Sequence, residues 1–203
     1  PVPRYEVKRA AAPLTIDGKL DEAAWTAAAA VTLQFLWESQ TGAKQMTRAR
    51  LLWDAQGLYI GFDADDADIT AQFQQRDDPT YRDDAVEIFI NPNPQQEVVY
   101  YGFEMNARGV LYDYLNYNSR TLFKRFDATG VKVATSLRGT LNVRTDTDNG
   151  WSLEAICRPL VADDDRPALD EQPASGTQRR DRMRHIVERL EDRDQVVGPL
   201  EPQ

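Results

Sequence analysis

Two short runs of alternating apolar and polar residues, 85–90 and 100–106, constrain the fold of this chain more than any other feature. Successive side chains of a β-strand point to opposite faces, so each run predicts a strand with one apolar face. Two such strands in succession predict part of an antiparallel sheet that covers a core with one face. The apolar sets are Val86, Ile88 and Ile90 in the first run and Tyr101, Phe103 and Met105 in the second.

The opposite faces of the two runs carry polar and aromatic groups. These are Glu87 in the first run and Tyr100, Glu104 and Asn106 in the second, with Gly102 leaving a gap among them and Tyr81 shortly before. A mid-strand glutamate between apolar neighbours needs an explanation, because carboxylates are rarely buried without a partner. One explanation is a solvated face or an ion pair, and the other is an acceptor for ligand hydroxyls. Carboxyl, amide and phenol groups beside an aromatic plane suit a sugar, whose ring has apolar C–H faces and a hydroxyl rim.

The rest of the first 157 residues also consists of short alternating runs separated by turns, as in an antiparallel β protein. Residues 48–53 and 57–64 predict a hairpin across Asp54-Ala-Gln-Gly57. Asp21 is expected to cap a short helix that continues to Ala30. Further strands are expected at 14–16, 131–137, 141–145 and 151–156.

The composition changes after residue 157. All 19 Phe, Trp and Tyr residues precede position 152, and residues 158–203 contain none. The change predicts a β domain over 1–157 and an atypical tail over 158–203. In the tail, Asp163-Asp-Asp165 and Pro167 indicate a loop. Helical spacing of four apolar residues indicates a possible amphipathic helix formed around Met183, Ile186, Val187 and Leu190.

Length, charge and residue counts exclude several classes of protein. A chain of 203 residues can form one domain with a substantial core. The net charge of -9 argues against a nucleic-acid or anionic-membrane surface. No apolar run approaches the ~20 residues of a membrane span, and no charged-then-apolar leader is present, so a secretion signal is expected to be absent or removed. Cys157 and His185 are the only cysteine and histidine, which excludes an internal disulfide and multi-cysteine or multi-histidine metal sites.

Five segments resemble motifs of carbohydrate-binding module family 9, in that family's order. They are Asp17-Gly-Lys-Leu-Asp-Glu-Ala-Ala-Trp25, Leu51-Leu-Trp-Asp-Ala-Gln-Gly-Leu-Tyr-Ile60, Asp83-Asp-Ala-Val-Glu-Ile-Phe-Ile-Asn-Pro92, Phe103-Glu-Met-Asn106 and Gly150-Trp-Ser-Leu-Glu-Ala-Ile156. The resemblance implies an antiparallel β-sandwich of the DOMON-like type, here followed by an irregular or helical tail. It also implies an extracellular or periplasmic domain that accompanies enzymes degrading plant polysaccharides such as xylan.

The same resemblance assigns roles to individual residues. In sugar-binding members an aromatic residue just before the Asp-x-Val-Glu motif stacks on the sugar, and Tyr81 has that position. The motif glutamate corresponds to Glu87 and the strand asparagine to Asn106, and both make polar contacts in the family. Glu104 has the position where the sugar-binding prototype often has arginine, so a cationic donor is missing. The family's second stacking aromatic comes from near the C-terminus, where this chain has no aromatic residue.

The resemblance therefore implies non-catalytic binding of a mono- or oligosaccharide. The candidate ligand-binding residues are Tyr81, Glu87, Tyr100, Glu104 and Asn106. One alternative is an interaction domain that kept the sandwich and lost sugar binding. Another is a glycoside hydrolase that uses Glu87 and Glu104, since hydrolysis needs two carboxyl groups ~5–9.5 Å apart.

The resemblance also implies a structural Ca²⁺ ion as a cofactor. Its oxygen ligands would come from the acidic residues after the 57–64 strand, which are Asp63, Asp65, Asp66 and Asp68. Their spacing fits no complete EF-hand loop, so a solvated acidic loop is the alternative. Met46 and Met105 could ligate haem, which some DOMON-like domains bind. Without a histidine in the sandwich region, no haem is expected.

Overall fold

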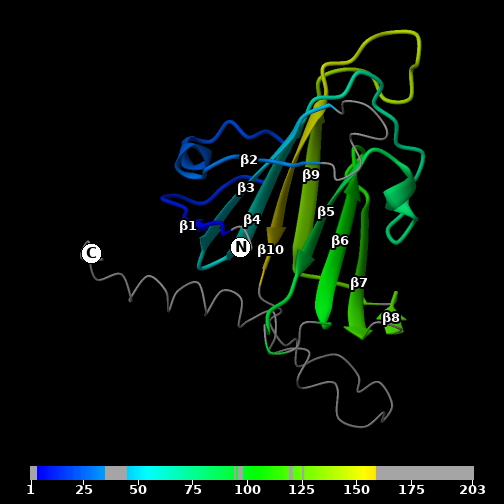
Figure 1. The fold of residues 1–203 in the computed structure, drawn as a ribbon. Helices are drawn as coiled ribbons and strands as arrows, with labels where there is room; N and C mark the ends of the chain where they lie inside the picture. Colours follow the sequence, from blue (N-terminus) through cyan, green and yellow to red (C-terminus); the bar gives the residue numbers. More distant parts are fainter. Residues whose placement is uncertain are drawn as a thin grey trace.

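The computed structural model describes residues 4–34, 45–93, 95, 98–118, 121–124 and 126–158. In this part of the chain ten strands form two sheets (Figure 1). The larger sheet has the strand order β1-β3-β4-β10-β9 with β2 paired to β3, and the smaller has the order β5-β6-β7-β8. The strands are β1 (Lys8–Arg9), β2 (Val31–Thr32), β3 (Thr47–Asp54), β4 (Gly57–Ala64), β5 (Ala85–Ile90), β6 (Tyr100–Asn106), β7 (Leu111–Asn118), β8 (Thr121–Phe123), β9 (Val131–Leu137) and β10 (Trp151–Cys157).

The expected antiparallel β-sandwich is confirmed, with one exception in the pairing. β1 runs parallel to β3, whereas the other neighbouring strands are antiparallel. The hairpin of β3 and β4 turns at Asp54–Gly57 as predicted. Its turn is closed by Asp54, whose Oδ1 accepts a hydrogen bond from the Gln56 N–H at 2.7 Å. Gly57 has a φ of 155°, which favours glycine at this position.

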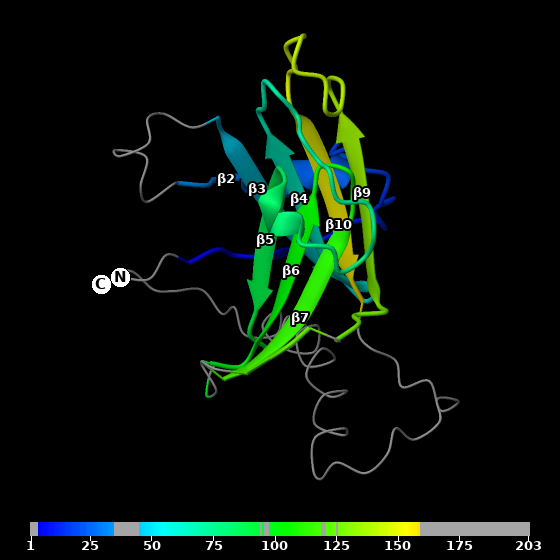
Figure 2. The ribbon, with the colours of Figure 1, turned by 90° about the vertical axis from the view of Figure 1, so that its right-hand side faces the viewer.

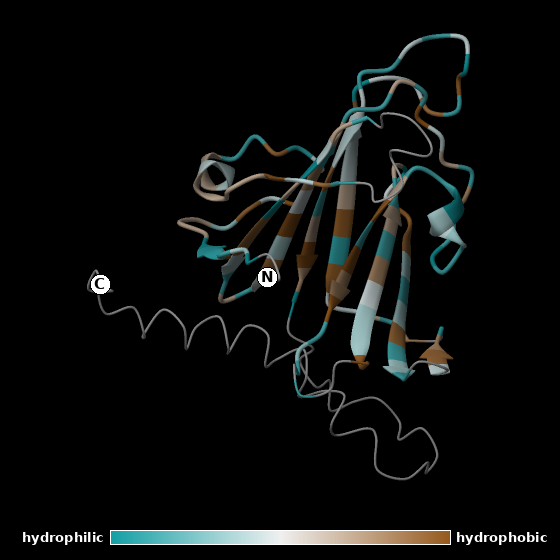
Figure 3. Ribbon diagram, in the orientation of Figure 1, coloured by the Kyte–Doolittle hydropathy of each residue, from teal (hydrophilic) through white to brown (hydrophobic). Residues whose placement is uncertain are grey.

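The hydrophobic core lies between the two sheets, which Figure 2 shows stacked face to face. Alternate residues of the central strands supply it, and Figure 3 shows this alternation as brown segments between pale or teal ones. The two faces predicted for 85–90 and 100–106 are confirmed. Its members include Trp53 of β3, Ile60 and Phe62 of β4, Val86 and Ile90 of β5, Tyr101, Phe103 and Met105 of β6, and Trp151 and Leu153 of β10.

A second apolar cluster covers the outer face of the larger sheet. The segment of residues 10–28 contributes one side of it and strands β3, β4 and β10 the other. Because Leu58 packs in the core and Tyr59 in this second cluster, β4 is buried on both faces. The cluster consists of Leu14, Ile16, Trp25, Ala28, Leu52, Tyr59 and Ile156.

Glu154 of β10 fastens this N-terminal segment to the sheet. Its side chain is fully buried. Its Oε1 accepts a hydrogen bond from Trp25 Nε1 at 2.8 Å, and its Oε2 accepts from the backbone N–H groups of Asp17 and Gly18, each at 3.0 Å. On the same face, the Ser152 hydroxyl donates to the Gly18 carbonyl at 2.6 Å. These bonds join the Asp17–Trp25 motif to the Gly150–Ile156 motif.

Two predictions about the N-terminal segment are wrong. Residues 14–16 form no strand, because Leu14 and Ile16 pack on top of the larger sheet instead of pairing within it. The helix expected up to Ala30 is a single 3₁₀ turn, η1 (Ala23–Ala27). The N-cap position belongs to Glu22 rather than Asp21, and it makes no side-chain cap hydrogen bond. The chain returns to extended backbone at Ala28, so tertiary contacts override the helical propensity of the alanines.

The strand expected at 141–145 is also absent, since these residues form turns in the loop between β9 and β10. Asn142 has a φ of 63°, in the left-handed region, which interrupts extended backbone. Its backbone N–H donates to the Ile69 carbonyl at 2.8 Å, and its Oδ1 accepts from the Ala71 N–H at 2.9 Å. The loop is therefore fixed to segment 69–71 and not to a sheet.

The tail predicted at 158–203, with its helix, lies outside the described residues except for Arg158. Within the described ranges, no helix has the length and apolar character needed to cross a bilayer.

Candidate functional site

The outer face of the smaller sheet carries the predicted site. The strand register pairs Glu87 of β5 with Glu104 of β6, and Glu104 with Tyr112 of β7. Alternate residues share a face, and the intervening residues of these strands point into the core. These side chains therefore lie on the side away from the core. We call the following set the tyrosine face: Tyr81, Glu87, Phe89, Tyr100, Glu104, Tyr112 and Tyr114.

A row of aromatic rings crosses the tyrosine face. The centroid distances are 6.1 Å from Tyr81 to Tyr112, 5.5 Å from Tyr112 to Tyr114, 6.4 Å from Tyr114 to Tyr100 and 5.5 Å from Tyr100 to Phe89. Tilted and edge-to-face pairs at these distances attract one another. The two end rings are exposed, Tyr81 by 56% and Phe89 by 53%, whereas Tyr112 and Tyr114 are buried. The inner rings thus support exposed rings at both ends of the row.

Gly102 allows the row to lie close to the sheet. A Cβ atom at this position would lie 2.3 Å from Cζ of Tyr114. Only glycine leaves room for the Tyr114 ring without displacing it. The gap expected at Gly102 is therefore filled by an aromatic side chain of the neighbouring strand.

Tyr81 lies in a 3₁₀ turn, η2 (Thr80–Arg82), whose backbone is held on both sides. Thr80 is fully buried, and its hydroxyl donates to the β6 backbone at 3.2 Å. Asp83 accepts hydrogen bonds from the backbone N–H groups of residues 72 and 73 at 2.9 and 3.1 Å. The turn therefore presents the Tyr81 ring to solvent from a fixed backbone.

Glu104 is the most unusual group on this face. Its side chain is only 6% exposed, and its Oε2 has no hydrogen-bond partner. Burial first, and the Glu87 carboxylate second, raise the pKa of Glu104 to about 7, against a hydrogen bond from the Tyr114 hydroxyl. Glu87 is exposed, and partial burial raises its pKa as well. Within the described residues, no ion pair joins either carboxylate to a lysine or arginine.

Asn106 lies beneath this face rather than on it. It is fully buried, and its Nδ2 donates to the Phe73 carbonyl at 3.0 Å and to Asp83 Oδ2 at 2.8 Å. Its Oδ1 accepts from the N–H groups of Arg108 and Val110 at 3.1 and 2.9 Å. Both donors and both acceptor positions of the amide are occupied. Asn106 can contact a ligand only by giving up one of these bonds, and it holds the loop that precedes Tyr81.

The structure therefore brings Tyr81, Glu87, Tyr100 and Glu104 together on one surface. The sequence analysis missed Tyr112 and Tyr114, which complete the row of rings. The signal was present in the run Leu111-Tyr-Asp-Tyr-Leu115, where the two tyrosines alternate with core residues.

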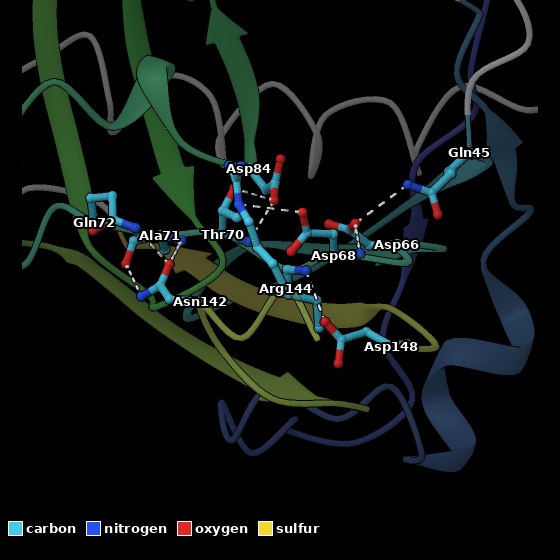
Figure 4. A network of polar contacts seen from close by, with 11 residues as sticks. Gln45, Asp66, Asp68, Thr70, Ala71, Gln72, Asp84, Asn142, Arg144 and Asp148 are labelled. Carbon is cyan, nitrogen blue, oxygen red and sulfur yellow. Dashed lines mark hydrogen bonds and ion pairs between the residues drawn. The ribbon is translucent and has the colours of Figure 1, made fainter. Parts of the chain in front are cut away.

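Figure 4 shows the polar network of the loop that follows β4. Asp84 accepts hydrogen bonds from the N–H and hydroxyl of Thr70 at 2.7 and 2.9 Å. Burial is the main cause that raises the pKa of Asp84, and the neighbouring Asp66 carboxyl adds to it. Asp68 lies 3.8 Å from the Arg144 guanidinium. Asp66 and Asp84 thus offer adjacent carboxyl oxygens of the type that Ca²⁺ prefers.

The other two predicted calcium ligands, Asp63 and Asp65, are directed toward arginines. Asp63 accepts a hydrogen bond from Arg138 at 2.8 Å and lies 3.8 Å from Arg48. Asp65 lies 4.0 Å from Arg48. The four predicted ligands are therefore divided between two environments, and calcium binding stays a prediction.

A further acidic group, Asp77, Asp113 and Asp127, brings carboxylate oxygens within 4.8 Å of one another. Arg76 donates to Asp113 at 2.7 Å and to Asp127 at 2.9 Å. Asp113 is fully buried on the core side of β7, and burial raises its pKa to about 6. A guanidinium of the chain itself thus supplies positive charge to this group.

The sandwich is similar to solved structures of proteins linked to carbohydrate binding. One is a Bacteroides uniformis protein proposed to bind carbohydrate, with 18% identity, a TM-score of 0.63 and coverage of 75% of this chain and 71% of that chain. A carbohydrate-binding module of family 9 from Caldicellulosiruptor kristjanssonii matches in complexes with cellotriose and with glucose. These matches have 16% identity, TM-scores of 0.51 and 0.53, and coverage of 84% of this chain and 70% and 72% of the others. The fold is therefore that of a family 9 carbohydrate-binding module.

The sequence identifies the family directly. Residues 16–154 match the family described as "Carbohydrate family 9 binding domain-like", and the chain belongs to it. The comparison with curated proteins gave no match.

Proposed function

We propose that the protein binds carbohydrate, without catalysis, at the tyrosine face. The observation that carries this proposal is the exposed Tyr81 ring, whose backbone is fixed. It lies on the same face of the sheet as the Glu87–Glu104 pair. An exposed aromatic ring can stack on the C–H face of a sugar. Carboxyl oxygens beside the ring can accept hydrogen bonds from the sugar hydroxyls. Family membership supports the same role.

The arrangement of the carboxylates favours binding over hydrolysis. Glu87 and Glu104 are paired on neighbouring strands and point to the same side of the sheet. A sugar lying on this face meets both groups from one side. Glycoside hydrolysis needs two carboxyl groups that flank the scissile bond. Hydrolysis of a chromogenic glycoside that is abolished by Glu87→Gln would contradict this reasoning.

Calorimetry or affinity electrophoresis with glucose, xylose, cello-oligosaccharides and xylo-oligosaccharides tests the proposal. We expect binding that Tyr81→Ala weakens at least about tenfold, since the variant loses the apolar ring surface on which the C–H face of the sugar would be buried. Tyr117→Ala is the matched control. Tyr117 is 50% exposed and packs on Phe123, at the other end of β7.

Tyr117→Ala is expected to bind as the unmodified protein does, because its ring lies outside the row on the tyrosine face. Absence of binding to every sugar would favour the alternative of an interaction domain that has lost sugar binding. Binding that is unchanged by Tyr81→Ala would move the site away from the tyrosine face.

The family resemblance supports a role in a secreted or periplasmic system that degrades polysaccharides such as xylan, beside a glycoside hydrolase. Calcium would have a structural role in this proposal, held at Asp66 and Asp84. Thermal unfolding in calcium and in a chelator tests it, with a higher midpoint expected in calcium because a bound ion stabilises the folded state. Equal midpoints for the two conditions would remove calcium from the proposal.

A further inference from the structure

The tyrosine face has a negative pair without a described counter-charge. Glu104 and Glu87 are cross-strand partners on one surface. Paired residues of neighbouring strands have Cβ atoms about 4.5–5.5 Å apart, and like charges in this position repel. Glu104 is buried, and its Oε2 has no hydrogen-bond partner. Such an atom is costly unless something that binds there supplies a donor.

We propose that the tyrosine face prefers sugars that carry a protonated amine, such as free hexosamines and their oligomers, over neutral sugars. This inference rests on the proposed sugar binding at the same face. It names the chemical class of ligand that the Glu87–Glu104 pair would select.

An ammonium group matches this pair better than a hydroxyl does. It has three N–H donors, enough to bridge two carboxylates, whereas a hydroxyl has one. Its positive charge also compensates the repulsion between the two carboxylates. The last torsion of a glutamate side chain is broad, so Glu104 can turn either oxygen toward the amine. A hydroxyl in the place of the amine satisfies one acceptor and leaves the repulsion in place.

The surrounding rings favour the same class of ligand. The faces of tyrosine rings attract cations within about 6 Å of the ring centroid. Four tyrosines lie in the row that surrounds the pair, which are Tyr81, Tyr100, Tyr112 and Tyr114. The net charge of -9 adds a long-range attraction for cationic ligands. An acidic sugar would be repelled by the carboxylate pair, by the faces of the rings and by the net charge of the protein.

The test is a comparison of glucosamine with glucose by calorimetry, at low ionic strength and a pH where the amine is largely protonated. N-acetylglucosamine keeps the nitrogen without its charge, and glucuronic acid reverses the charge. We expect glucosamine to bind at least about tenfold more tightly than glucose, and glucuronic acid to bind most weakly. The advantage of glucosamine should decrease with added salt, because salt screens exposed charges.

Glu104→Gln, which keeps the shape of the side chain, tests whether this pair is the cause. The ratio of glucosamine affinity to glucose affinity should decrease toward one in this variant and in Glu87→Gln. Glu6→Gln removes the same charge at an exposed position in the N-terminal segment and should leave the ratio unchanged.

The possible outcomes separate this inference from the proposed function. Equal affinities for glucose and glucosamine in the unmodified protein would overturn the amine preference and leave sugar binding standing. A preference that persists in both glutamine variants would also overturn it. Absence of binding to every sugar would overturn both proposals.

Discussion

The outer faces of the two sheets each carry one buried glutamate, and the two glutamates are treated differently. Burial raises the pKa of Glu154 and of Glu104 to about 7 in both cases. Glu154 accepts three hydrogen bonds, from Trp25 Nε1 and two backbone N–H groups. Glu104 has an oxygen with no partner and a second carboxylate beside it. A buried carboxylate that is fully bonded holds the fold together, whereas an oxygen without a partner is available to bind something else.

On the outer face of each sheet a glycine lies under a side chain that covers it. The two covering side chains come from different parts of the chain. A Cβ at Gly61 would lie 2.6 Å from Leu20 Cδ2 and 3.2 Å from the Trp25 ring, both from the N-terminal segment. A Cβ at Gly102 would instead meet the Tyr114 ring of the neighbouring strand. One sheet is thus covered by another part of the chain, and the other is covered by its own tyrosines. The second face is the one that remains available to a ligand.

Loss of the Glu154 carboxylate is expected to have the largest effect on stability. Glu154→Ala leaves three donors without an acceptor, two of them buried, and creates a cavity beneath Trp25. The free energy of unfolding should decrease by about 3 kcal/mol or more, since each unsatisfied buried group costs about 1–3 kcal/mol. Urea unfolding followed by tryptophan fluorescence measures it.

Glu87→Ala is the matched control for that variant. Glu87 is exposed, and its removal relieves the repulsion on Glu104. Its unfolding free energy should change by less than about 0.5 kcal/mol, or increase slightly. Equal losses in Glu154→Ala and Glu87→Ala would contradict the conclusion that the hydrogen bonds of Glu154 hold the fold together.

The alternation of apolar and polar residues was enough to predict the open face, but not the covered one. In 85–106 the period of two separates core from surface, and the structure confirms both sets except for Asn106, which is buried. The same rule could not show that Leu14 and Ile16 form a third layer, because an apolar pair packs equally well within a sheet or on top of it. The role of Glu154 depends on contacts between residues 129 to 137 positions apart in the sequence. No local pattern encodes such a distance.

In the candidate site, too, local patterns predicted some positions, whereas positions that depend on long-range contacts could not be predicted. Tyr81, Glu87, Tyr100 and Glu104 could be placed on one surface from strand alternation and the family motifs. The burial of Asn106 could not be predicted, although Asn106 shares the strand parity of Glu104. The loop of residues 71–73 and Asp83 covers it. The alternation in Leu111–Leu115 indicates that Tyr112 and Tyr114 share one face, but the cross-strand register was needed to place them beside Glu104 and Gly102.

The pH dependence of stability in Glu104→Gln also tests the comparison between Glu104 and Glu154. We expect its effect to be smaller than that of Glu154→Ala. The pKa of Glu104 is raised from 4.5 to about 7 in the folded protein. Folding therefore favours the protonated form, and its contribution to stability is complete below about pH 4.5 and is lost as the pH rises through 7. The carboxylate that faces Glu104 on this surface is Glu87, its cross-strand partner, and burial raises the pKa of Glu87 as well.

Glu104→Gln has no proton to lose, so it should be about as stable as the unmodified protein at pH 4.5. At pH 8 it should be more stable by about 1–3 kcal/mol, because the unmodified protein then buries a charged carboxylate and places it beside the Glu87 carboxylate. Glu154→Gln should be less stable than the unmodified protein at both pH values, since its new amide group would direct donors toward N–H groups that Glu154 now accepts from. Urea unfolding of the three proteins at both pH values measures these differences. Higher stability of Glu154→Gln than of the unmodified protein at pH 8 would show that the hydrogen bonds to Glu154 do not distinguish the two carboxylates.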